Sequence, residues 1–356
     1  MNKLRYIFIA VLSLLTFSVS FSQTEETSQQ EKVNATEIVM GHITDSYEWH
    51  ITKIGETDIV VPLPVIVYSS TTGWHMFSSS HLYPEGTEYE GFHIATEGDH
   101  VGKIVETTVE GEKKPFDISL TKTVLALLIN SLILILIILG CARWYKGRKA
   151  EDAAPKGFVG FMEMFIMMVE NDVIKTCVGE DYKKYSPYLL TAFFFILVNN
   201  VMGIIPIFPG GANVTGNIAV TLVLASCTFI AVNVFGNKEY WKDVLWPDVP
   251  MWLKVPIPIM PVIEIVGIFT KPFALMIRLF ANITAGHSAI LALVSIIFVT
   301  ATMGAAINGM MSALSILLVI FMNCLELLVA FIQAYVFTML SSVFIGLSRQ
   351  EAKKMN

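Results

Sequence analysis

Two apolar stretches near the C-terminal end are too long to stand upright in a lipid bilayer. They cover residues 262–301 and 311–347, and at about 1.5 Å per residue each would form a helix on the order of 55 to 60 Å long. The hydrocarbon core of a bilayer is only about 30 Å thick. The sequence therefore predicts a strongly tilted or bent antiparallel hairpin, with a tight reversal in the glycine-containing stretch at 303–310.

Three more apolar stretches have the ordinary length of a membrane span. Residues 123–142, 188–208 and 218–235 each supply close to the roughly 20 residues that a spanning helix needs. With 54% hydrophobic and only 15% charged residues, the chain is too apolar for an ordinary soluble domain. We therefore expect residues 118–356 to form an all-α polytopic membrane domain with about five transmembrane helices.

The first 22 residues have the pattern of a secretory signal peptide. Lys3 and Arg5 precede a short apolar core, and Ser20 and Ser22 supply the small residues of a cleavage site. The alternative is an uncleaved anchor helix, which the short apolar core disfavours. We therefore leave residues 1–22 out of the expected fold.

Residues 23–117 are acidic and polar, unlike the rest of the chain. Their β-branched and aromatic runs, broken by Gly, Pro and Ser, predict a small β-rich extracytoplasmic domain after a flexible leader at 24–37. Six of the seven histidines fall here, namely His42, His50, His75, His81, His93 and His100. A histidine metal site is the alternative to solvated or packed histidines, but no pair has the compact spacing of a known zinc motif. We predict no metal and no cofactor.

The basic residues predict how the chain is oriented. They cluster at 143–149, 237–242 and 349–354, whereas 209–217 and the hairpin reversal carry none. Because cytoplasmic loops are enriched in Lys and Arg, the mature N-terminus is expected outside and the C-terminus inside. Five crossings of the cell inner membrane satisfy this arrangement.

Two further segments are expected to lie at the membrane surface. Residues 157–175 are apolar on a broad face with acidic residues between, and residues 239–256 are rich in Trp and Pro. We expect the methionines of the first segment to pack against lipid or a partner helix rather than to bind a metal.

Polar side chains within the two long spans are few. The fourth span carries Glu264, Lys271, Arg278, Asn282 and His287, and the fifth carries Glu326 and Gln333. Charged groups are costly in a bilayer, so by default they are functional and need a partner. A reversal near residues 305 and 306 would place Arg278 at the depth of Gln333. It would place His287 close to the depth of Glu326, about 13 Å further out.

The chemistry of these side chains separates their possible roles. Arginine keeps its proton in proteins, so Arg278 can act only as a fixed positive charge toward a carboxylate. Histidine beside a carboxylate titrates in a useful range, so His287 with Glu326 is a candidate proton-accepting pair on a path from outside. Glu264, about 21 Å toward the inside from Arg278, is a candidate for a second path. The alternative is a purely structural pair, with Gln333 only hydrogen-bonding Arg278.

Three motifs carry a resemblance to a known family. They are KPFALMIRLFANITAGH at 271–287 with its Arg-Leu-Phe-x-Asn core, ELLVAFIQAYVFTML at 326–340, and NNVMGIIP at 199–206. Arg278 has no carboxylate at its own depth in these spans, so we expect its partner on another chain. Together the motifs resemble subunit a of the F-type ATP synthase, over roughly residues 156–354.

This resemblance implies a proton-translocating stator subunit of the F0 sector. The hairpin would be pressed against a ring of c subunits, with b-type stator subunits and the rest of the complex as further partners. Arg278 would have the role of the essential arginine, meeting each ring carboxylate between two offset aqueous half-channels. Asn282, Gln333 and Glu264 match polar sites near these channels. No glycine-rich phosphate loop or basic nucleic-acid face occurs, so nucleotide chemistry is expected on other subunits.

The chain also departs from the family pattern. Many bacterial relatives carry Glu at the position of His287 and His at that of Glu326, so this chain resembles an exchange of the two. Where relatives often carry acidic residues near the end of the second span, this chain has Gly203 and Phe208. Two neighbouring residues, Asn199 and Asn200, are left as weaker channel candidates. The extension at 23–117 lies outside the common core, and we expect only stator or interface contacts from it.

Two other functional classes remain open at this point. A self-contained secondary transporter or ion channel would also place charges at mid-membrane, but it predicts inverted repeats or discontinuous helices around a site. A non-conducting scaffold for the extracytoplasmic domain leaves the polar hairpin unexplained. The sequence does not choose between protons and sodium ions, because that choice depends largely on the carboxylate site of the ring.

Overall fold

The computed structural model describes most of the chain beyond residue 44. The described ranges are 45–54, 57–98, 100–108, 111–149, 151–205, 208–246 and 259–349. The expected signal peptide, the leader and His42 lie outside the described residues, as does the Trp-rich connector from residue 247 onward.

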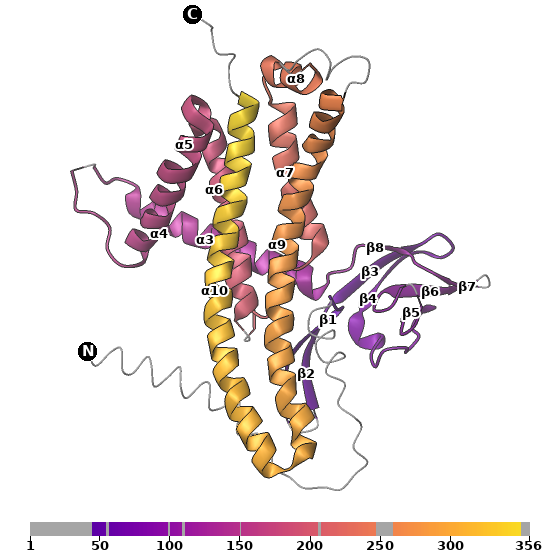
Figure 1. The fold of residues 1–356 in the computed structure, drawn as a ribbon. Helices are drawn as coiled ribbons and strands as arrows, with labels where there is room; N and C mark the ends of the chain where they lie inside the picture. The colour runs from indigo at the N-terminus through magenta and orange to yellow at the C-terminus, as the bar shows by residue number, and fades with distance from the viewer. Residues whose placement is uncertain are drawn as a thin grey trace, which may run out of the picture. The chain divides into compact units, whose positions relative to one another are not determined.

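The N-terminal part of the described chain is built from short antiparallel strands. These are β1 (Glu48–Ile54), β2 (Thr57–Pro62), β3 (Pro64–Ser69), β4 (Gly73–Ser78), β5 (Phe92–Ile94), β6 (Ile104–Thr108), β7 (Gly111–Lys113) and β8 (Phe116–Asp117). They form three small sheets, with strand orders β1-β2, β4-β3-β8 and β5-β6-β7. The expected β-rich region is therefore confirmed (Figure 1).

Alternating side chains explain why this β-rich domain folds. In β3, Val65 and Val67 are buried while Tyr68 points outward, which is the period-two pattern of a strand with one covered face. The two valines join a core of buried residues: Tyr47, Leu82, Phe92, Ile94 and Ile104. Burying such apolar side chains is the main force that holds a domain this small together.

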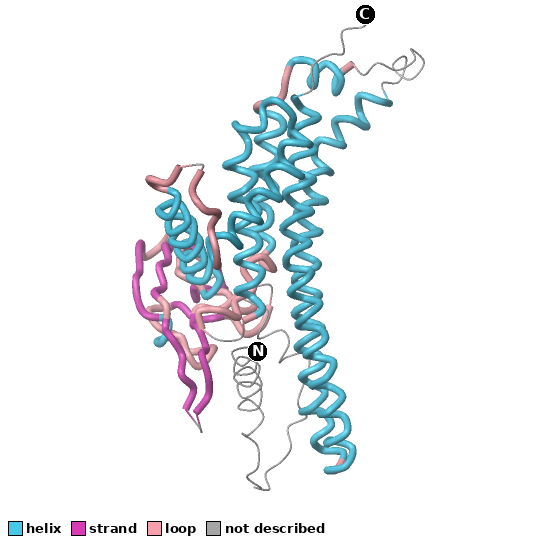
Figure 2. The backbone as a smooth tube through the Cα atoms, turned by 90° about the vertical axis from the view of Figure 1, so that its left-hand side faces the viewer, coloured by secondary structure: helices cyan, strands magenta, loops and turns pink. Residues whose placement is uncertain are grey.

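Helices make up the rest of the described chain. They are α3 (Lys122–Tyr145), α4 (Phe158–Met167), α5 (Lys175–Val178), α6 (Tyr182–Ile204), α7 (Ile218–Val234), α8 (Lys238–Leu245), α9 (Ile259–Thr300) and α10 (Ala305–Arg349). Within the described ranges, four helical runs are long and apolar enough to cross a membrane. The number is five if the bent pair α7 and α8 counts as one span. The expected polytopic, mostly helical membrane fold is confirmed (Figure 2).

The long hairpin has a shorter reversal than the sequence suggested. The chain turns at a 3-10 segment, Ala301–Met303, followed by Gly304 at φ 100°. A positive φ is open to glycine at little cost, so one residue suffices to end α9. The helix α10 then starts at Ala305, so residues 305–310 are helical and the expected reversal near 305 and 306 lay too far along the chain. At about 1.5 Å per residue, α9 and α10 are roughly 63 and 68 Å long, so both must tilt strongly in a bilayer.

The two expected surface segments contain helices. Residues 157–175 form α4 and a π-helical stretch, Met168–Ile174, and the second segment begins with α8. Gly179, at φ 78°, separates α5 from α6. The helix α6 begins at Tyr182, six residues before the expected start at 188, and ends at Ile204.

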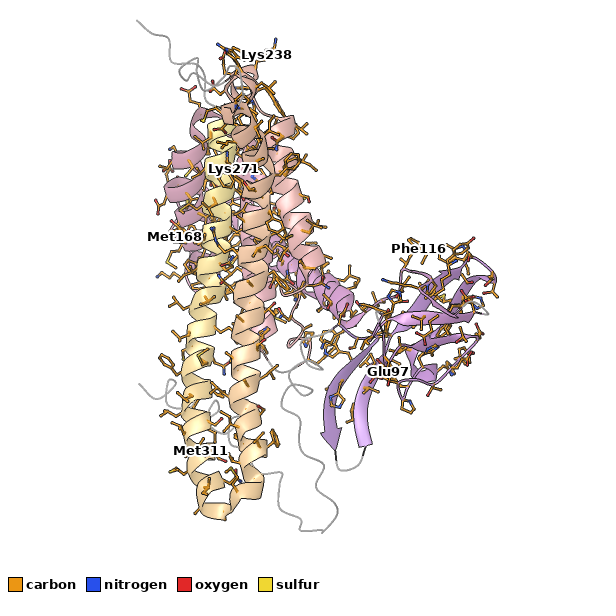
Figure 3. The ribbon with its side chains drawn as sticks, turned by 45° about the vertical axis from the view of Figure 1, so that its right-hand side comes forward. Glu97, Phe116, Met168, Lys238, Lys271 and Met311 are labelled. Atoms are coloured by element: carbon orange, nitrogen blue, oxygen red, sulfur yellow. The ribbon has the colours of Figure 1, made fainter. Side chains whose placement is uncertain are left out.

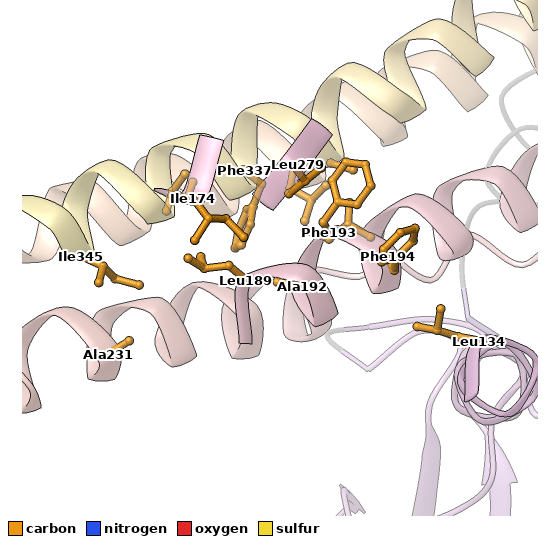
Figure 4. Close-up of a cluster of buried hydrophobic side chains, with 14 of the residues drawn as sticks. Leu134, Ile174, Leu189, Ala192, Phe193, Phe194, Ala231, Leu279, Phe337 and Ile345 are labelled. Carbon is orange, nitrogen blue, oxygen red and sulfur yellow. The ribbon is translucent and has the colours of Figure 1, made fainter. Parts of the chain in front are cut away.

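The core of the helical part lies where α6, α9 and α10 meet. It includes Leu189 and Phe193 from α6, Leu279 from α9, and Phe337 from α10 (Figure 4). The same cluster takes in Ile174 from the π-helical stretch. Because these side chains are buried against one another, the facing surfaces of the hairpin and α6 are fixed relative to each other.

Candidate functional site

His287 and Glu326 meet across the hairpin, as the sequence led us to expect. The Nδ1 atom of His287 lies 2.6 Å from Oε1 of Glu326, and the glutamate is only 5% exposed. Neither carboxylate oxygen has a well-aligned hydrogen-bond donor among the described residues, so the two groups are close without a hydrogen bond of good geometry. A Cβ atom at Gly286 would lie 3.1 Å from Oε1, so the glycine lets the carboxylate approach the α9 backbone.

Gly203 at the end of α6 makes room for the other edge of the histidine ring. A Cβ atom there would lie 3.3 Å from Nε2 of His287 and 3.6 Å from the carbonyl oxygen of Ala212. Contacts of 3.3 Å are tighter than carbon normally tolerates, so a side chain at this position would press on the ring. His287 therefore fits between Glu326 on α10 and Gly203 on α6.

Gln333 contacts Asn282 and not Arg278. Nδ2 of Asn282 donates to Oε1 of Gln333 at 2.9 Å, which corrects the expected level pairing of Gln333 with Arg278. The reason is the unequal paths of the two helices. Close to the reversal Thr300 contacts Asn308, so the chain uses 18 residues of α9 but 25 residues of α10 before it reaches the Asn282–Gln333 contact. Equal residue counts from the turn therefore do not give equal depths.

Arg278 points away from the chain's own core. It is exposed, while the adjacent Leu279 and the nearby Leu275 are buried. Among the described residues it has no hydrogen-bond or ion-pair partner, although it sits within one of the apolar membrane helices. Asn282, four residues further along α9, is exposed on the same side. The guanidinium and this asparagine thus form an open polar surface on α9.

Glu264 and Lys271 lie toward the beginning of α9. Glu264 is half-buried near Tyr240 of α8, and the Lys271 ammonium lies 5.8 Å from the centre of the Phe344 ring. Figure 3 shows Lys271 near the opposite end of the hairpin from Met311. A cavity of about 10 Å³, lined in part by Lys271, Tyr240 and Asn233, lies beside them. That volume is about the size of one water.

Asn199 and Asn200 are buried and bind neighbouring elements. Asn199 accepts a hydrogen bond from Nδ2 of Asn130 on α3 at 3.0 Å. Asn200 donates to the carbonyl oxygen of Ala330 on α10 at 3.3 Å and accepts from the hydroxyl of Thr215 at 2.6 Å. The two asparagines therefore tie α6 to α3, to α10 and to the segment that follows α6.

Several residues of this region escaped the sequence reasoning. Asn130, a lone amide in an apolar span, was a detectable signal, because a buried amide needs a partner. Gly203 gave no signal of its role, since its effect depends on a ring that comes from another helix. A buried run of hydroxyls between α6, α7 and α10 was also missed: Tyr188 to Thr228 at 2.9 Å, and Thr228 to Ser341 at 3.2 Å.

Two histidines of the β-rich domain are each paired with one carboxylate. His75 contacts Glu90 at 2.8 Å and His93 contacts Glu112 at 3.3 Å. In the described part of the chain, no three His, Cys, Asp or Glu side chains gather in a way that could hold a metal ion.

Comparisons with known proteins divide the chain into two matched regions. Residues 38–123 match a family model described as a domain of unknown function, DUF8433. The chain is 44% identical over 239 residues to an ATP synthase subunit a of Chlorobium phaeobacteroides and 42% identical over 239 residues to one of Chloroherpeton thalassium. It is 45% identical over 242 residues to an ATP synthase subunit a 2 of Chlorobaculum tepidum.

These alignments cover 65% of this chain and between 64% and 67% of the three relatives, so the chain spans about two thirds of their length. Residues 126–346 match the family model described as ATP synthase A chain. That match includes α6, α7 and nearly all of the hairpin, with every polar residue of the site described above. Because the matched region is more than half of the chain, this protein belongs to the ATP synthase A chain family.

Proposed function

We propose that this chain is the ion-translocating stator subunit of the F0 sector of an F-type ATP synthase. It would couple ion flow to rotation of a ring of c subunits and so to ATP synthesis. The observation that carries the proposal is Arg278, an exposed guanidinium in an apolar helix, with no partner among the described residues of its own chain. Such a charge is costly in lipid and therefore calls for a carboxylate on another subunit.

Arg278 acts as a fixed positive charge at the ring. Its guanidinium does not lose its proton, so it attracts each ring carboxylate in its ionised form without relaying a proton. A ring carboxyl group that is still protonated is neutral, so it gains no ionic attraction to Arg278. Only the ionised form is favoured as it passes the arginine. The arginine thereby blocks a direct leak between the two sides of the membrane.

Two polar regions on opposite sides of Arg278 supply the half-channels. His287 lies nine residues along α9, about 13 Å further on and roughly opposite around the helix, where it meets Glu326. Glu264 lies fourteen residues in the other direction, about 21 Å away, near Tyr240, which together with Lys271 lines the small cavity. Because the two regions are separated along the helix, an ion must travel on the ring to pass from one to the other.

Asn282 and Gln333 act beside the arginine. Their hydrogen bond of 2.9 Å links α9 to α10 one turn from Arg278. This contact orients the face that meets the ring. Asn199 and Asn200 support the outer half-channel by holding α6 in place.

The surroundings of the subunit follow from the same proposal. It would lie in the cell inner membrane with the mature N-terminus outside and the C-terminus inside, as the basic segments at 143–149, 237–242 and 349–354 suggest. Its partners would be the c-ring and b-type stator subunits, with nucleotide chemistry on the other subunits of the complex. This chain itself would carry no catalytic residue.

The test compares proton flux in membrane vesicles that contain the whole complex. Arg278→Ala should abolish ATP-driven proton pumping, while Arg143→Ala, which removes an exposed arginine at the end of α3, should leave it unchanged. Both complexes are first checked for assembly and for ATP hydrolysis. Pumping at the wild-type level in Arg278→Ala would overturn the proposal. Ion flux through the purified chain alone would favour a self-contained transporter instead.

A further inference from the structure

The β-rich domain contacts the segment that lies over the histidine of the proposed outer half-channel. Trp49 of β1 is only 4% exposed, and it belongs to a buried apolar cluster with Ala126 of α3 and with Ala212 and Val214. Its ring also meets Phe208 edge-on, with ring centres 4.9 Å apart. We call residues 208–217, between α6 and α7, the α6–α7 loop.

The same loop is held on its other side by the channel region. Gly211 donates its backbone N–H to the carbonyl oxygen of Met202 at 3.1 Å, and Thr215 donates to Asn200 at 2.6 Å. The carbonyl oxygen of Ala212 faces Gly203, the residue that makes room for Nε2 of His287. A series of closely placed groups therefore runs from Trp49 through the α6–α7 loop and past Gly203 to His287 and Glu326.

Short hydrogen bonds fix the domain on the start of α3. The backbone N–H of Lys122 donates to the carbonyl oxygen of Ser46 at 2.9 Å, and that of Thr123 donates to a carboxylate oxygen of Asp45 at 3.0 Å. These bonds lie close to the contact between Trp49 and Ala126 on both segments. They therefore fix the start of β1, and with it Trp49, relative to α3.

We propose that the β-rich domain is a cap on the outer half-channel, in which Trp49 is a positioning residue that holds the α6–α7 loop over Gly203 and His287. This inference rests on the proposed function. The cap excludes bulk water from the Nε2 side of the ring and keeps Nδ1 directed at Glu326. Proton exchange with the outside then proceeds only along the narrow route that the loop leaves open.

Among the described residues, the environment of the His287 ring contains one charged side chain and several uncharged groups. Glu326 on α10 is the titratable group that faces the ring. The elements α6 and the loop present Gly203 and the carbonyl of Ala212, which carry no charge. Loosening the loop therefore changes how much water reaches the imidazole and how closely it meets Glu326, and proton uptake by an imidazole depends in general on its hydration and its charged neighbours.

The first test measures access to the loop beneath Trp49. Val214, fully buried in the Trp49 cluster, is changed to Cys in the whole complex after the four natural cysteines are replaced by alanine. A membrane-impermeant thiol reagent is then added from the outside. Trp49→Ala should raise the rate of labelling at least tenfold, an increase that corresponds to an opening easier by about 1.4 kcal/mol. Equal rates with and without Trp49 would overturn the cap.

Trp74 supplies the matched control for this experiment. It lies on β4, is 62% exposed, and pairs with Tyr68 of its own sheet rather than with the loop. Trp74→Ala removes an indole from the same domain, and it should leave the labelling rate at Val214→Cys unchanged. A rate raised equally by both tryptophan changes would show general loosening of the domain and would contradict a specific role of Trp49.

The second test measures function as the outside pH is varied. Trp49→Ala should shift the pH profile of proton-driven ATP synthesis, Trp49→Phe should restore it in large part, and Trp74→Ala should leave it unchanged. In a His287→Gln background, Trp49→Ala should have no further effect on the profile. An additive effect would mean that Trp49 does not act through His287.

The results for Arg278→Ala and Trp49→Ala distinguish failure of the proposed function from failure of the cap. If Arg278→Ala stops coupled pumping while Trp49→Ala behaves like Trp74→Ala, the proposed function stands and the cap is wrong. If Arg278→Ala pumps normally, the proposed function fails, while the labelling result still reports whether Trp49 covers the loop.

Discussion

The two arginines on the long helices differ in how many hydrogen-bond partners the rest of the chain gives them. Arg349, at the end of α10, donates from Nε to Asp181 at 3.0 Å and from Nη1 to the carbonyl oxygen of Phe235 at 3.0 Å, and it also binds Oδ1 of Asn237 at 2.9 Å. Arg278, in the middle of α9, is exposed and has no such partner among the described residues. One guanidinium is saturated by its own chain, and the other is left open.

Under the proposed function, this contrast distinguishes a structural charge from one that meets another subunit. A guanidinium has five donors, and leaving them unpaired in an apolar setting costs more than an unpaired neutral group does. The chain meets that cost at Arg349 by gathering Asp181, the end of α7 and the start of α8 around it. At Arg278 the described residues provide no such shell, and this difference is what supports the proposal of a partner on another subunit.

The largest expected effect tests whether the open charge needs its particular geometry. Arg278→Lys keeps the positive charge but loses the planar fork that can bind a carboxylate through two hydrogen bonds. We expect ATP-driven pumping to fall by roughly 100-fold or more, equivalent to about 2.7 kcal/mol. Pumping is measured in vesicles against Arg143→Lys, an equally exposed arginine outside the site. Retention of most activity would show that charge alone suffices at this position.

The next largest effect is expected at His287 and Glu326, which contact each other within the hairpin. His287→Glu alone and Glu326→His alone should each lower pumping about tenfold or more, because like groups then face each other across 2.6 Å. The double variant His287→Glu/Glu326→His restores an acid and a base at the same depth, and it should recover much of the loss. A double variant as poor as the worse single one would refute the idea that the two residues act together.

A smaller effect is expected at the saturated arginine. Arg349→Ala should lower the temperature at which the complex inactivates by a few degrees, because it releases Asp181 and both groups bound near α7 and α8. The ratio of protons pumped to ATP hydrolysed should not change in the complexes that remain assembled. Asp181→Ala should act similarly, and the two changes combined should cost less than their sum. A change in the ratio of protons pumped to ATP hydrolysed would mean that Arg349, like Arg278, takes part in pumping.

The smallest effect concerns a buried carboxylate in the β-rich domain. Glu106 is 8% exposed and accepts hydrogen bonds from the hydroxyls of Thr71 and Ser69, which hold its pKa below the ordinary value of 4.5. A carboxyl group whose pKa is lowered by folding stabilises the folded domain at pH values above its ordinary pKa. This stabilisation is lost as the pH falls through the lowered pKa.

Glu106→Gln should therefore make the domain several-fold more sensitive to protease at pH 7, with a difference that narrows below about pH 4. Limited proteolysis of the assembled complex measures this, with the exposed Glu97→Gln as the control. A difference that does not depend on pH would mean that shape rather than charge stabilises the site.

Much of the membrane part could be predicted because charged residues in apolar spans are conspicuous. Arg278, His287 and Glu326 were found in this way, and the contact between the last two is present. The predicted partner of Gln333 was wrong because α10 uses more residues than α9 between the Thr300–Asn308 contact and the Asn282–Gln333 contact. That difference arises from the packing of whole helices, which residue spacing does not encode.

The contacts of the β-rich domain were beyond sequence reasoning for another reason. Trp49 looks like any aromatic residue of a β-strand, and its neighbours Ala126, Ala212 and Val214 are ordinary small apolar residues. The cluster forms only when segments about 80 and 160 residues away in the sequence are brought to Trp49. Nothing in the composition of either segment indicates the other.

The cluster around Trp49 also lies across the boundary between the two matched regions. The match to the domain of unknown function ends at residue 123 and the ATP synthase A chain match begins at residue 126, so the two regions adjoin within the first turn of α3. Trp49 belongs to the first region, while Ala126, Ala212 and Val214 belong to the second. A larger side chain at any of these three positions would therefore disturb the junction between the two matched regions, although each region's own core lies elsewhere.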